Sequence, residues 1–405
     1  MKKINGIKGA LLASLFAVSG AHAAGFALIE QSASGMGNAF AGGAAAAEDA
    51  STVYFNPAGM TYIQGTQIVG AIHLIKPSAE FTNNGSTPVG GGNGGDAGDL
   101  NYVPNIYFVT DMSPTVKFGI GLNSPFGLKT QYDATWVGRF QAIKSNLETF
   151  NINPSVAYKV NDQLSVGMGI SAMWIQAELS RAATSATDQV TIKGDDIDLG
   201  YNFGAIYQAT ADTRFGIAYR SKMNERLEGT LARPVASLVL PVTAKVTLPD
   251  NFSASFFSKL NDQWDVMGDV TWTQWSRFKE LRVLSSAGTT LSLTPENWHN
   301  TLRYSIGASY HYSDDLKLRA GLAYDEEAID DAFRTARIPG NDRTWISLGA
   351  GYQLTPAGKV DVGYSHLFIS DASINHAESG PPATTLKGSV SGEVNILSVQ
   401  YTHNF

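Results

Sequence analysis

The side chains best suited to chemistry in this chain are its histidines, and their placement argues against catalysis. Beyond the first 23 residues they stand at His73, His299, His311, His366, His376 and His403. They are scattered, and no serine near them lies in a nucleophile motif, whereas nucleophilic catalysis needs a nucleophile, a base and an orienting group together. Their spacing does not match a metal-ligand set, and the chain has no cysteine. We therefore expect no enzyme activity, no metal and no cofactor.

The composition also limits the class of partner. The chain has 405 residues, of which 16% are charged, and a formal net charge of -7. Lysine and arginine are spread thinly along it, so no nucleic-acid partner is expected. The glycine-rich residues 90–95 lack the strand–helix context of a phosphate-binding loop. We interpret them as a flexible external loop.

The N-terminal 23 residues have the features of a cleaved signal peptide. Lysines 2, 3 and 8 precede an apolar run over residues 10–18, and Ala21-His22-Ala23 has the small-x-small pattern of a cleavage site. The apolar run is too short to cross a bilayer as a helix, and no later segment has 18 consecutive apolar residues. Only helices and closed barrels span membranes. If this exported chain enters a membrane, it must do so as a β-barrel.

From about residue 100 onward, apolar residues alternate with small or polar ones, most clearly over residues 164–175 and 304–312. A period of two is typical of strands with one apolar face. Counting such segments predicts an all-β, fourteen-stranded antiparallel transmembrane barrel, with the even strand number of bacterial barrels. The expected strand starts are Gly65, Val103, Val116, Glu148, Leu164, Asp195, Arg214, Val242, Trp264, Thr301, Leu316, Trp345, Val360 and Ser389.

Short and long connections alternate between these segments. Tight polar turns such as Asn161-Asp162 and Asn261-Asp262 suit hairpins. Outer-membrane barrels have this asymmetry, with short periplasmic turns and long extracellular loops. The chain ends on Phe405, which resembles the C-terminal signature of barrels handed to the outer-membrane assembly machinery. The expected long loops are residues 76–101, 133–147, 182–194, 228–243, 285–299, 326–343 and 371–390.

Residues 24–63 do not alternate and are rich in glycine and alanine. Small residues allow short helices and turns to pack closely. The segment could be a periplasmic tail or a plug in the lumen. A barrel of this size must be filled or conduct water, which favours the plug. The predicted division is therefore a signal peptide at 1–23, an N-terminal hatch domain at 24–63 and a barrel at 64–405.

Several short motifs follow one another along the mature chain. They are Ala24-Gly25-Phe26, Ser34-Gly35-x-Gly37, Asn56-Pro57-Ala58, Val103-Pro104-Asn105, Trp272-Thr273-Gln274-Trp275, Arg319-Ala320-Gly321, Arg334-Thr335 and Ile338-Pro339. In this order they resemble the FadL-type family of outer-membrane transporters for long-chain fatty acids and hydrocarbons. The resemblance covers essentially the whole mature chain. It implies a fourteen-stranded barrel with a lumenal hatch, whose end the Asn56-Pro57-Ala58 triplet marks.

The resemblance also implies a route. In that family, hydrophobic molecules bind in the lumen and leave sideways through an opening made by a kink in the third strand. Ser124 and Gly127 match the kink positions, and Pro125 lies between them. Proline cannot donate to a strand ladder and glycine tolerates unusual dihedral angles, so both suit such a break. A simple bulge is the alternative.

Two residues match the family's inner binding site. Phe26 matches a phenylalanine inserted beside the pocket, although it could serve only to anchor the hatch. Arg181 matches a basic residue that could hold a carboxylate by paired hydrogen bonds, or it could be a solvated arginine at a loop edge. The chain departs from the fatty acid carriers in two ways, because Thr294 replaces a lysine and the loop at 182–194 is short. The apolar residues 234–241 could form a surface patch where substrate arrives, or could pack under neighbouring loops.

The expected function is import of hydrophobic compounds across the bacterial outer membrane, with long-chain fatty acids as the expected substrates. Loss of the family's lysine leaves monoaromatic hydrocarbons as an alternative. A general porin is a second alternative, which the predicted plug and the weakly charged strand faces oppose. The expected partners are the hydrophobic substrate, lipopolysaccharide and outer-membrane lipid, and the barrel assembly machinery. The resemblance alone implies a monomer.

Overall fold

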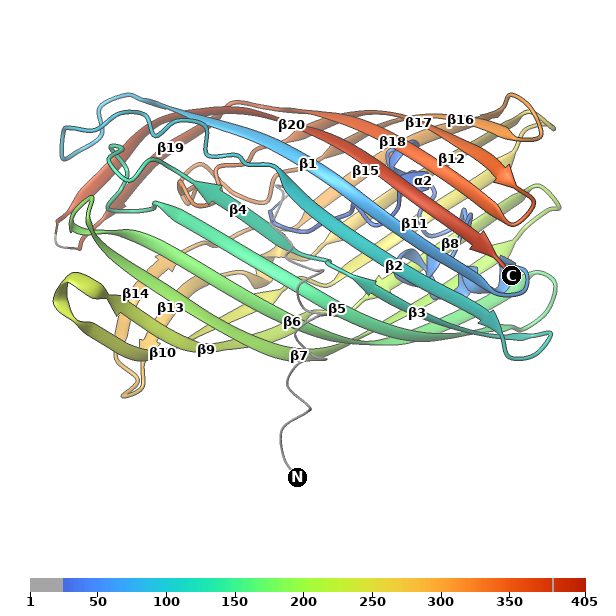
Figure 1. The fold of residues 1–405 in the computed structure, drawn as a ribbon, viewed down its shortest axis with the longest axis horizontal. Coiled ribbons are helices and arrows are strands. Elements are labelled where there is room, and N and C mark those ends of the chain that lie inside the picture. The colour runs from blue at the N-terminus through green and yellow to red at the C-terminus, as the bar shows by residue number, and fades with distance from the viewer. Residues whose placement is uncertain (1–24, 381) are drawn as a thin grey trace.

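The computed structural model describes residues 25–380 and 382–405. The predicted signal peptide at 1–23 lies outside these residues. Figure 1 shows an elongated barrel of tilted strands. Residues 25–63, which precede the first strand, lie in its interior. Within the described residues, no helix is long and apolar enough to span a membrane.

Twenty strand segments of the described chain form one closed antiparallel sheet. The segments are β1 (Gln67–Asn83), β2 (Asn101–Asp111), β3 (Val116–Asn123), β4 (Gly127–Gln131), β5 (Lys144–Lys159), β6 (Leu164–Ser185), β7 (Asp188–Gln208), β8 (Thr213–Arg220), β9 (Met223–Arg233), β10 (Leu238–Leu248), β11 (Asn251–Lys259), β12 (Trp264–Thr273), β13 (Glu280–Ser285), β14 (Thr290–Pro295), β15 (Thr301–His311), β16 (Leu316–Asp325), β17 (Arg343–Thr355), β18 (Gly358–Ile369), β19 (Ala372–Glu378) and β20 (Thr384–Asn404).

Six barrel strands are interrupted, and each interruption splits one strand into two segments. The split strands are β3/β4, β8/β9, β10/β11, β12/β13, β14/β15 and β18/β19, so the twenty segments make fourteen barrel strands. The barrel closes where β1 pairs with β20 along their length, from Gln67 opposite Asn404 to Asn83 opposite Gly388. Closure leaves no long free edge in the hydrocarbon, where unpaired backbone groups are costly. The predicted fourteen-stranded antiparallel barrel is confirmed.

Several predicted long loops are wrong, because the strands continue through them. β6 has 22 residues, β7 has 21, and they meet in a tight turn at residues 186–187. At about 3.3 Å per residue, β6 is roughly 70 Å long, whereas about ten residues suffice to cross the bilayer. The hairpins β6–β7, β9–β10, β13–β14 and β19–β20 therefore occupy much of the predicted loops at 182–194, 228–243, 285–299 and 371–390. Alternation fades there because neither face meets lipid.

The N-terminal segment folds into short pieces inside the barrel. They are α2 (Ala33–Met36), α3 (Thr52–Phe55) and the 3-10 helix η1 (Pro57–Tyr62), and β1 begins at Gln67. Glycines of the barrel wall let this backbone approach closely. A Cβ on Gly321 would lie 2.2 Å from the carbonyl carbon of Asn38, and one on Gly216 would lie 1.9 Å from the Ala44 oxygen. The segment is thus seated directly against the wall.

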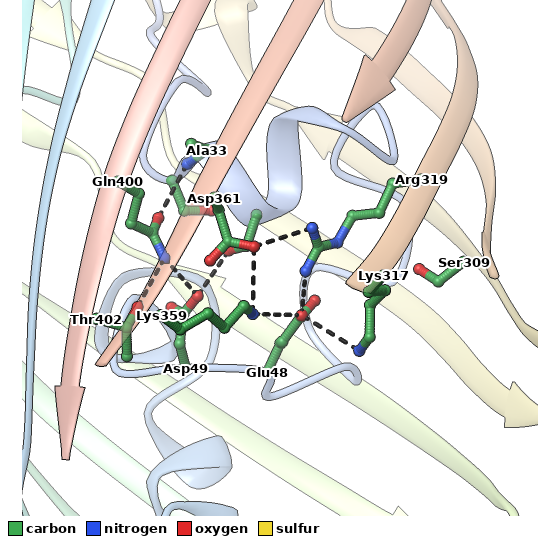
Figure 2. A network of polar contacts seen from close by, with 12 residues as sticks. Ala33, Glu48, Asp49, Ser309, Lys317, Arg319, Lys359, Asp361, Gln400 and Thr402 are labelled. Carbon is green, nitrogen blue, oxygen red and sulfur yellow. Dashed lines mark hydrogen bonds and ion pairs between the residues drawn. The ribbon is translucent and has the colours of Figure 1, made fainter. Parts of the chain in front are cut away.

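A cluster of ion pairs joins this segment to strands β16 and β18, as Figure 2 shows. Glu48 forms ion pairs with Arg319, with Lys359 at 3.0 Å and with Lys317 at 3.3 Å. Arg319 and Lys359 also contact Asp361 at 2.9 and 3.2 Å. Burial alone would raise the pKa of Glu48, but the three cations hold that pKa well below its usual value. Glu48 therefore stays ionised and ties the segment to the wall.

Asn56 of the Asn56-Pro57-Ala58 triplet makes a second attachment. Its side-chain oxygen accepts a hydrogen bond from the Ala58 backbone at 3.0 Å and begins η1, with Pro57 in the first turn. Its Nδ2 lies within hydrogen-bond distance of three carbonyl oxygens, those of Ala44 (2.6 Å), Ala205 (3.2 Å) and Ile217 (3.2 Å). The triplet thus joins the lumenal segment to β7 and β8.

Candidate functional site

The barrel wall is interrupted between its second and third strands. β2 pairs with β3 only from Ile106 opposite Leu122 to Asp111 opposite Lys117. Ser124, Pro125 and Phe126 then separate β3 from β4, and β4 pairs with β5. In the described chain β4 has no pairing with β2. The result is a local gap in the hydrogen-bond ladder at the three predicted kink residues, Ser124, Pro125 and Gly127.

The start of the lumenal segment lies against this kink and hydrogen-bonds to it. Leu28 N donates to the Pro125 carbonyl at 2.8 Å, and Gly127 N donates to the Phe26 carbonyl at 2.9 Å. Gln31 adds a hydrogen bond from its side-chain amide to the Ser124 carbonyl at 3.0 Å. The backbone groups that the kink removes from the ladder are therefore paired with the lumenal segment instead.

Phe26 is buried in a cage of aromatic rings. Its ring centroid lies 4.9 Å from that of Trp275, 5.7 Å from Trp298, 5.8 Å from Phe278 and 6.1 Å from Phe126. The tilted and edge-on arrangements are those that aromatic quadrupoles favour. The phenylalanine that sequence resemblance assigned to the inner site is thus held tightly, although the same contacts suit an anchor.

Phe126 lies at the kink, and the other cage residues come from breaks elsewhere in the wall. Trp275 lies in the 3-10 helix η3 (Trp275–Arg277), which with Phe278 separates β12 from β13. Trp298 lies between β14 and β15. Because these residues leave the strand ladder, their large rings can turn into the lumen.

An apolar pocket extends outward from Phe26. The cavity volume of this pocket is about 90 Å³, and the pocket is partly open to its surroundings. Most of its wall is aliphatic or aromatic, and charged side chains reach it at Lys193, Glu296 and Arg337. The apolar lining residues are Phe26, Leu128, Leu147, Ala177, Leu179, Ile192, Leu227, Val242, Ala244, Val246, Phe278, Leu281, Val283 and Ile338.

Arg337 is one of the two cationic residues that line this pocket, and it is partly buried. It lies in the connection between β16 and β17, outside the membrane-spanning strands. Its guanidinium donates to the carbonyls of Gln141 (2.6 Å) and Lys144 (3.1 Å) and to the Ser145 hydroxyl (3.1 Å). In the described chain no carboxylate forms an ion pair with it. Burial lowers the pKa of Arg337 to about 10, so it remains charged at neutral pH.

Arg181 lies close enough to Arg337 for its charge to lower the pKa of that residue. It is partly buried near the outer end of β6, where its Nη1 donates to the Phe140 carbonyl at 3.3 Å, and it does not line the pocket. Sequence reasoning missed Arg337 and Trp298. Arg337 stands beside the quoted Ile338-Pro339 motif, so its position in a family motif was the available signal. Trp298 had no such signal, because a loop tryptophan is common at a membrane interface.

The outer face carries the apolar run at residues 234–241. Val235 and Val239 are 69% and 66% exposed at the tip of the β9–β10 hairpin, beside the short 3-10 helix η2 (Pro234–Ala236). The glycine-rich residues 90–95 are not a free linker. A Cβ on Gly94 would lie 2.9 Å from the Tyr132 ring, which stacks on Trp136 at 4.0 Å. Among the described residues, no group of histidine, aspartate and glutamate side chains could hold a metal ion.

The family follows from the whole chain. Residues 14–405 match the sequence profile of the family described as outer membrane protein transport protein (OMPP1/FadL/TodX). This chain belongs to the FadL family. It is thus an outer-membrane protein of a family that transports hydrophobic compounds. This is not an enzyme family.

Individual relatives agree with this assignment. The chain is 34% identical to outer membrane protein P1 of Haemophilus influenzae over 419 residues, covering 91% of this chain and 90% of the relative. It is 29% identical to the long-chain fatty acid transport protein of Escherichia coli K12 over 404 residues, covering 88% and 90%.

Solved structures show the same fold. A FadL homologue of Pseudomonas aeruginosa superposes with a TM-score of 0.88 at 25% identity, covering 94% of this chain and all of that chain. The toluene transporter TodX of Pseudomonas putida shares the fold with a TM-score of 0.65 at 15% identity, covering 88% and 94%.

Proposed function

We propose that this FadL-family member imports long-chain fatty acids and binds their carboxylate at Arg337. The supporting observation is a guanidinium that has no carboxylate ion pair among the described residues and lines a mostly apolar pocket. Burying a hydrocarbon tail contributes about 25 cal/mol per Å². A charge-assisted hydrogen bond to the head group adds about 1.5–3 kcal/mol. This assignment replaces Arg181 by Arg337 as the carboxylate ligand.

The proposed route uses the features in order from outside to inside. Exposed apolar residues such as Val235 and Val239 offer a first contact, and the pocket takes up the ligand. Displacement of Phe26 then breaks the hydrogen bonds of the N-terminal segment with Pro125 and Gly127. The gap between β2 and β4 would open to the membrane, and the ligand would leave sideways.

Neutral monoaromatic hydrocarbons are the second candidate, favoured by one observation. Glu296 is buried at the same pocket wall, where its carboxylate accepts a hydrogen bond from Trp298 Nε1 at 3.0 Å. Burial raises the pKa of Glu296 to about 8, so a ligand carboxylate could bind beside it only while Glu296 keeps its proton. Thr294, which is neutral where fatty acid carriers have a lysine, also favours a neutral substrate. The named fatty acid relative at 29% identity supports the first candidate.

Uptake by cells that lack their own carrier separates the two candidates. We expect wild type to take up labelled oleate, and Arg337→Gln to reduce this uptake tenfold or more, because about 1.4 kcal/mol corresponds to a factor of ten. Arg181→Gln is the matched control and should retain uptake, since its side chain lies outside the pocket. Toluene uptake without oleate uptake would instead establish hydrocarbon import. Oleate uptake unaffected by Arg337→Gln would refute carboxylate binding there.

A further inference from the structure

A second cavity lies on the other side of the aromatic cage. Its volume is about 110 Å³, and it is bounded by both the lumenal segment and the barrel wall. Trp275 and Ala27 line this cavity, whereas Phe26, whose ring packs on Trp275, lines the apolar pocket. The Phe26–Trp275 contact therefore separates two lumenal compartments. Their walls differ, because four charged side chains line the second cavity, namely Arg220, Asp269, Arg303 and Asp325.

One wall of this second cavity belongs to a buried row of alternating charges. Arg303 on β15 stands opposite Asp325 on β16, and Asp325 stands opposite Arg343 on β17. Arg303 is 6% exposed and Arg343 is 1% exposed. Arg303 donates through Nη2 to the Ala39 carbonyl at 2.9 Å, but its Nε and Nη1 have no hydrogen-bond partner. Since buried donors in proteins are normally paired, Arg303 has spare capacity to bind an acceptor.

Other charged side chains of the cavity already have hydrogen-bond partners. Arg220 donates to the Tyr54 carbonyl at 2.8 Å and to the Ser171 hydroxyl at 3.2 Å. Asp269 accepts hydrogen bonds from the hydroxyls of Ser255 and Thr271. Arg303 is therefore the charged group of this wall that a ligand could use.

The lumenal segment supplies a carboxylate to the same charge row. Glu30 is buried, four residues after Phe26, and its Oε2 has no hydrogen-bond partner. Burial raises the pKa of Glu30 to about 7, although the charges of Arg303 and Arg343 act in the opposite direction. Its ionised form is thus only weakly favoured. Glu30 belongs to the segment that must move when Phe26 is displaced.

We propose that Arg303 forms a second lumenal carboxylate site, which an amphipathic carboxylate occupies in place of Glu30. This inference rests on the proposed import of fatty acids and adds a second binding site to their path. The cavity's apolar residues, Leu28, Ile29, Phe40, Phe55 and Trp275, would contact the part of the tail nearest the head group. A ligand carboxylate adds little net buried charge beside Arg303 if Glu30 moves away or takes up a proton as the ligand arrives, which limits the cost of the transfer.

Binding stoichiometry tests this site in the purified full-length protein in lipid nanodiscs. Titration calorimetry with dodecanoate should resolve two sites in wild type. Arg303→Gln should remove one of them and leave the other, while Arg337→Gln should remove only the latter. Arg303→Lys should retain two sites with reduced affinity, because it keeps the charge but loses the planar fork. Glu30→Gln should tighten the Arg303 site about tenfold, since the competing carboxylate is gone.

The outcomes separate this inference from the proposed function. One dodecanoate site that depends on Arg337 and is unchanged by Arg303→Gln would overturn the second site and leave fatty acid import standing. A site that depends on Arg303 alone would uphold the second site and reject Arg337. No carboxylate site at all would reject both. If Arg303→Gln does not fold, an unchanged affinity in Glu30→Gln overturns the inference by itself.

Discussion

At the scale of single residues, Phe26 couples the pocket to the gap in the wall. Its ring lies in the aromatic cage, and its carbonyl accepts the hydrogen bond of Gly127 at the kink. Gly25 is required beside it, because its φ is +61° and a Cβ would lie 2.6 Å from the Trp275 ring. A ligand that takes the place of the Phe26 ring therefore also weakens the contacts that hold the N-terminal segment against the gap in the wall.

Phe26→Ala should weaken the contacts between the N-terminal segment and the gap in the wall without unfolding the barrel. Removing a buried phenylalanine side chain costs about 3–5 kcal/mol, and here the loss falls on the local packing of the N-terminal segment. We expect the amide of Gly127, which donates to Phe26, to exchange its hydrogen at least a hundredfold faster. The amide of Ala71, within the β1–β2–β20 sheet, is the control and should not change. Equal exchange at Gly127 in both proteins would show that Phe26 does not hold the segment in place.

At the scale of elements, the lumenal segment divides into an attached body and a separable start. The body is fixed by the ion cluster of Glu48 and by the three carbonyl contacts of Asn56. The start, from Gly25 to Gln31, is held mainly by the aromatic cage and a few hydrogen bonds to the kink. Movement of the start alone would open a path without releasing the body.

Glu48→Gln should detach the body. Among the described residues, the substitution leaves Arg319 and Lys359 with Asp361 as their remaining ionic partner and Lys317 with none. Because the Arg319 side chain is fully buried, the loss of one of its two carboxylate partners should lower the free energy of unfolding. Because the pKa of Glu48 is depressed, this stabilisation is present at neutral pH and is lost only as pH falls through that depressed pKa. Thermal unfolding in detergent at pH 7 should therefore begin at a lower temperature in the variant.

Lys159→Gln provides the control for that measurement. Its ion pair with Asp162 lies at the surface, where the two side chains are 42% and 97% exposed, and such pairs contribute about 1 kcal/mol or less. If Glu48→Gln unfolds like Lys159→Gln, the ion cluster does not anchor the lumenal segment.

At the scale of the whole molecule, the barrel is wide but filled. Fourteen strands enclose a lumen that residues 25–63 occupy, with glycines of the wall in direct contact with their backbone. The gap between β2 and β4 lies in the side of the barrel. This arrangement suits passage of a molecule that prefers lipid to water.

Ion conductance in planar bilayers tests the filled lumen. Wild type should be nearly silent, because residues 25–63 occupy the lumen in direct contact with the wall. Deleting residues 25–63 behind the signal peptide should produce a steady current, as expected for a barrel of this size without a plug. A steady current through wild type would instead support the general porin alternative.

The sequence alone determined the barrel and its family. Alternation between an apolar and a small or polar face is imposed by the two-residue repeat of a strand in lipid, so fourteen strands could be counted, and most starts lie within a few residues of those observed. Pro125 and Gly127 marked the kink because their backbone chemistry restricts or frees the chain locally. Outside the bilayer the lipid constraint ends, which is why the hairpin extensions were taken for loops.

The site depended on contacts that no local pattern encodes. Phe26, Trp275 and Trp298 are distant in sequence and meet because the barrel brings breaks in its wall against the start of the lumenal segment. Arg337 lines the pocket and Arg181 does not, because loop packing decides which guanidinium reaches the lumen. The row Arg303–Asp325–Arg343 exists only through strand register. Local sequence determines the backbone conformation of each segment and which side of a strand each residue lies on. Side chains from distant segments meet in the lumen only once the barrel has closed.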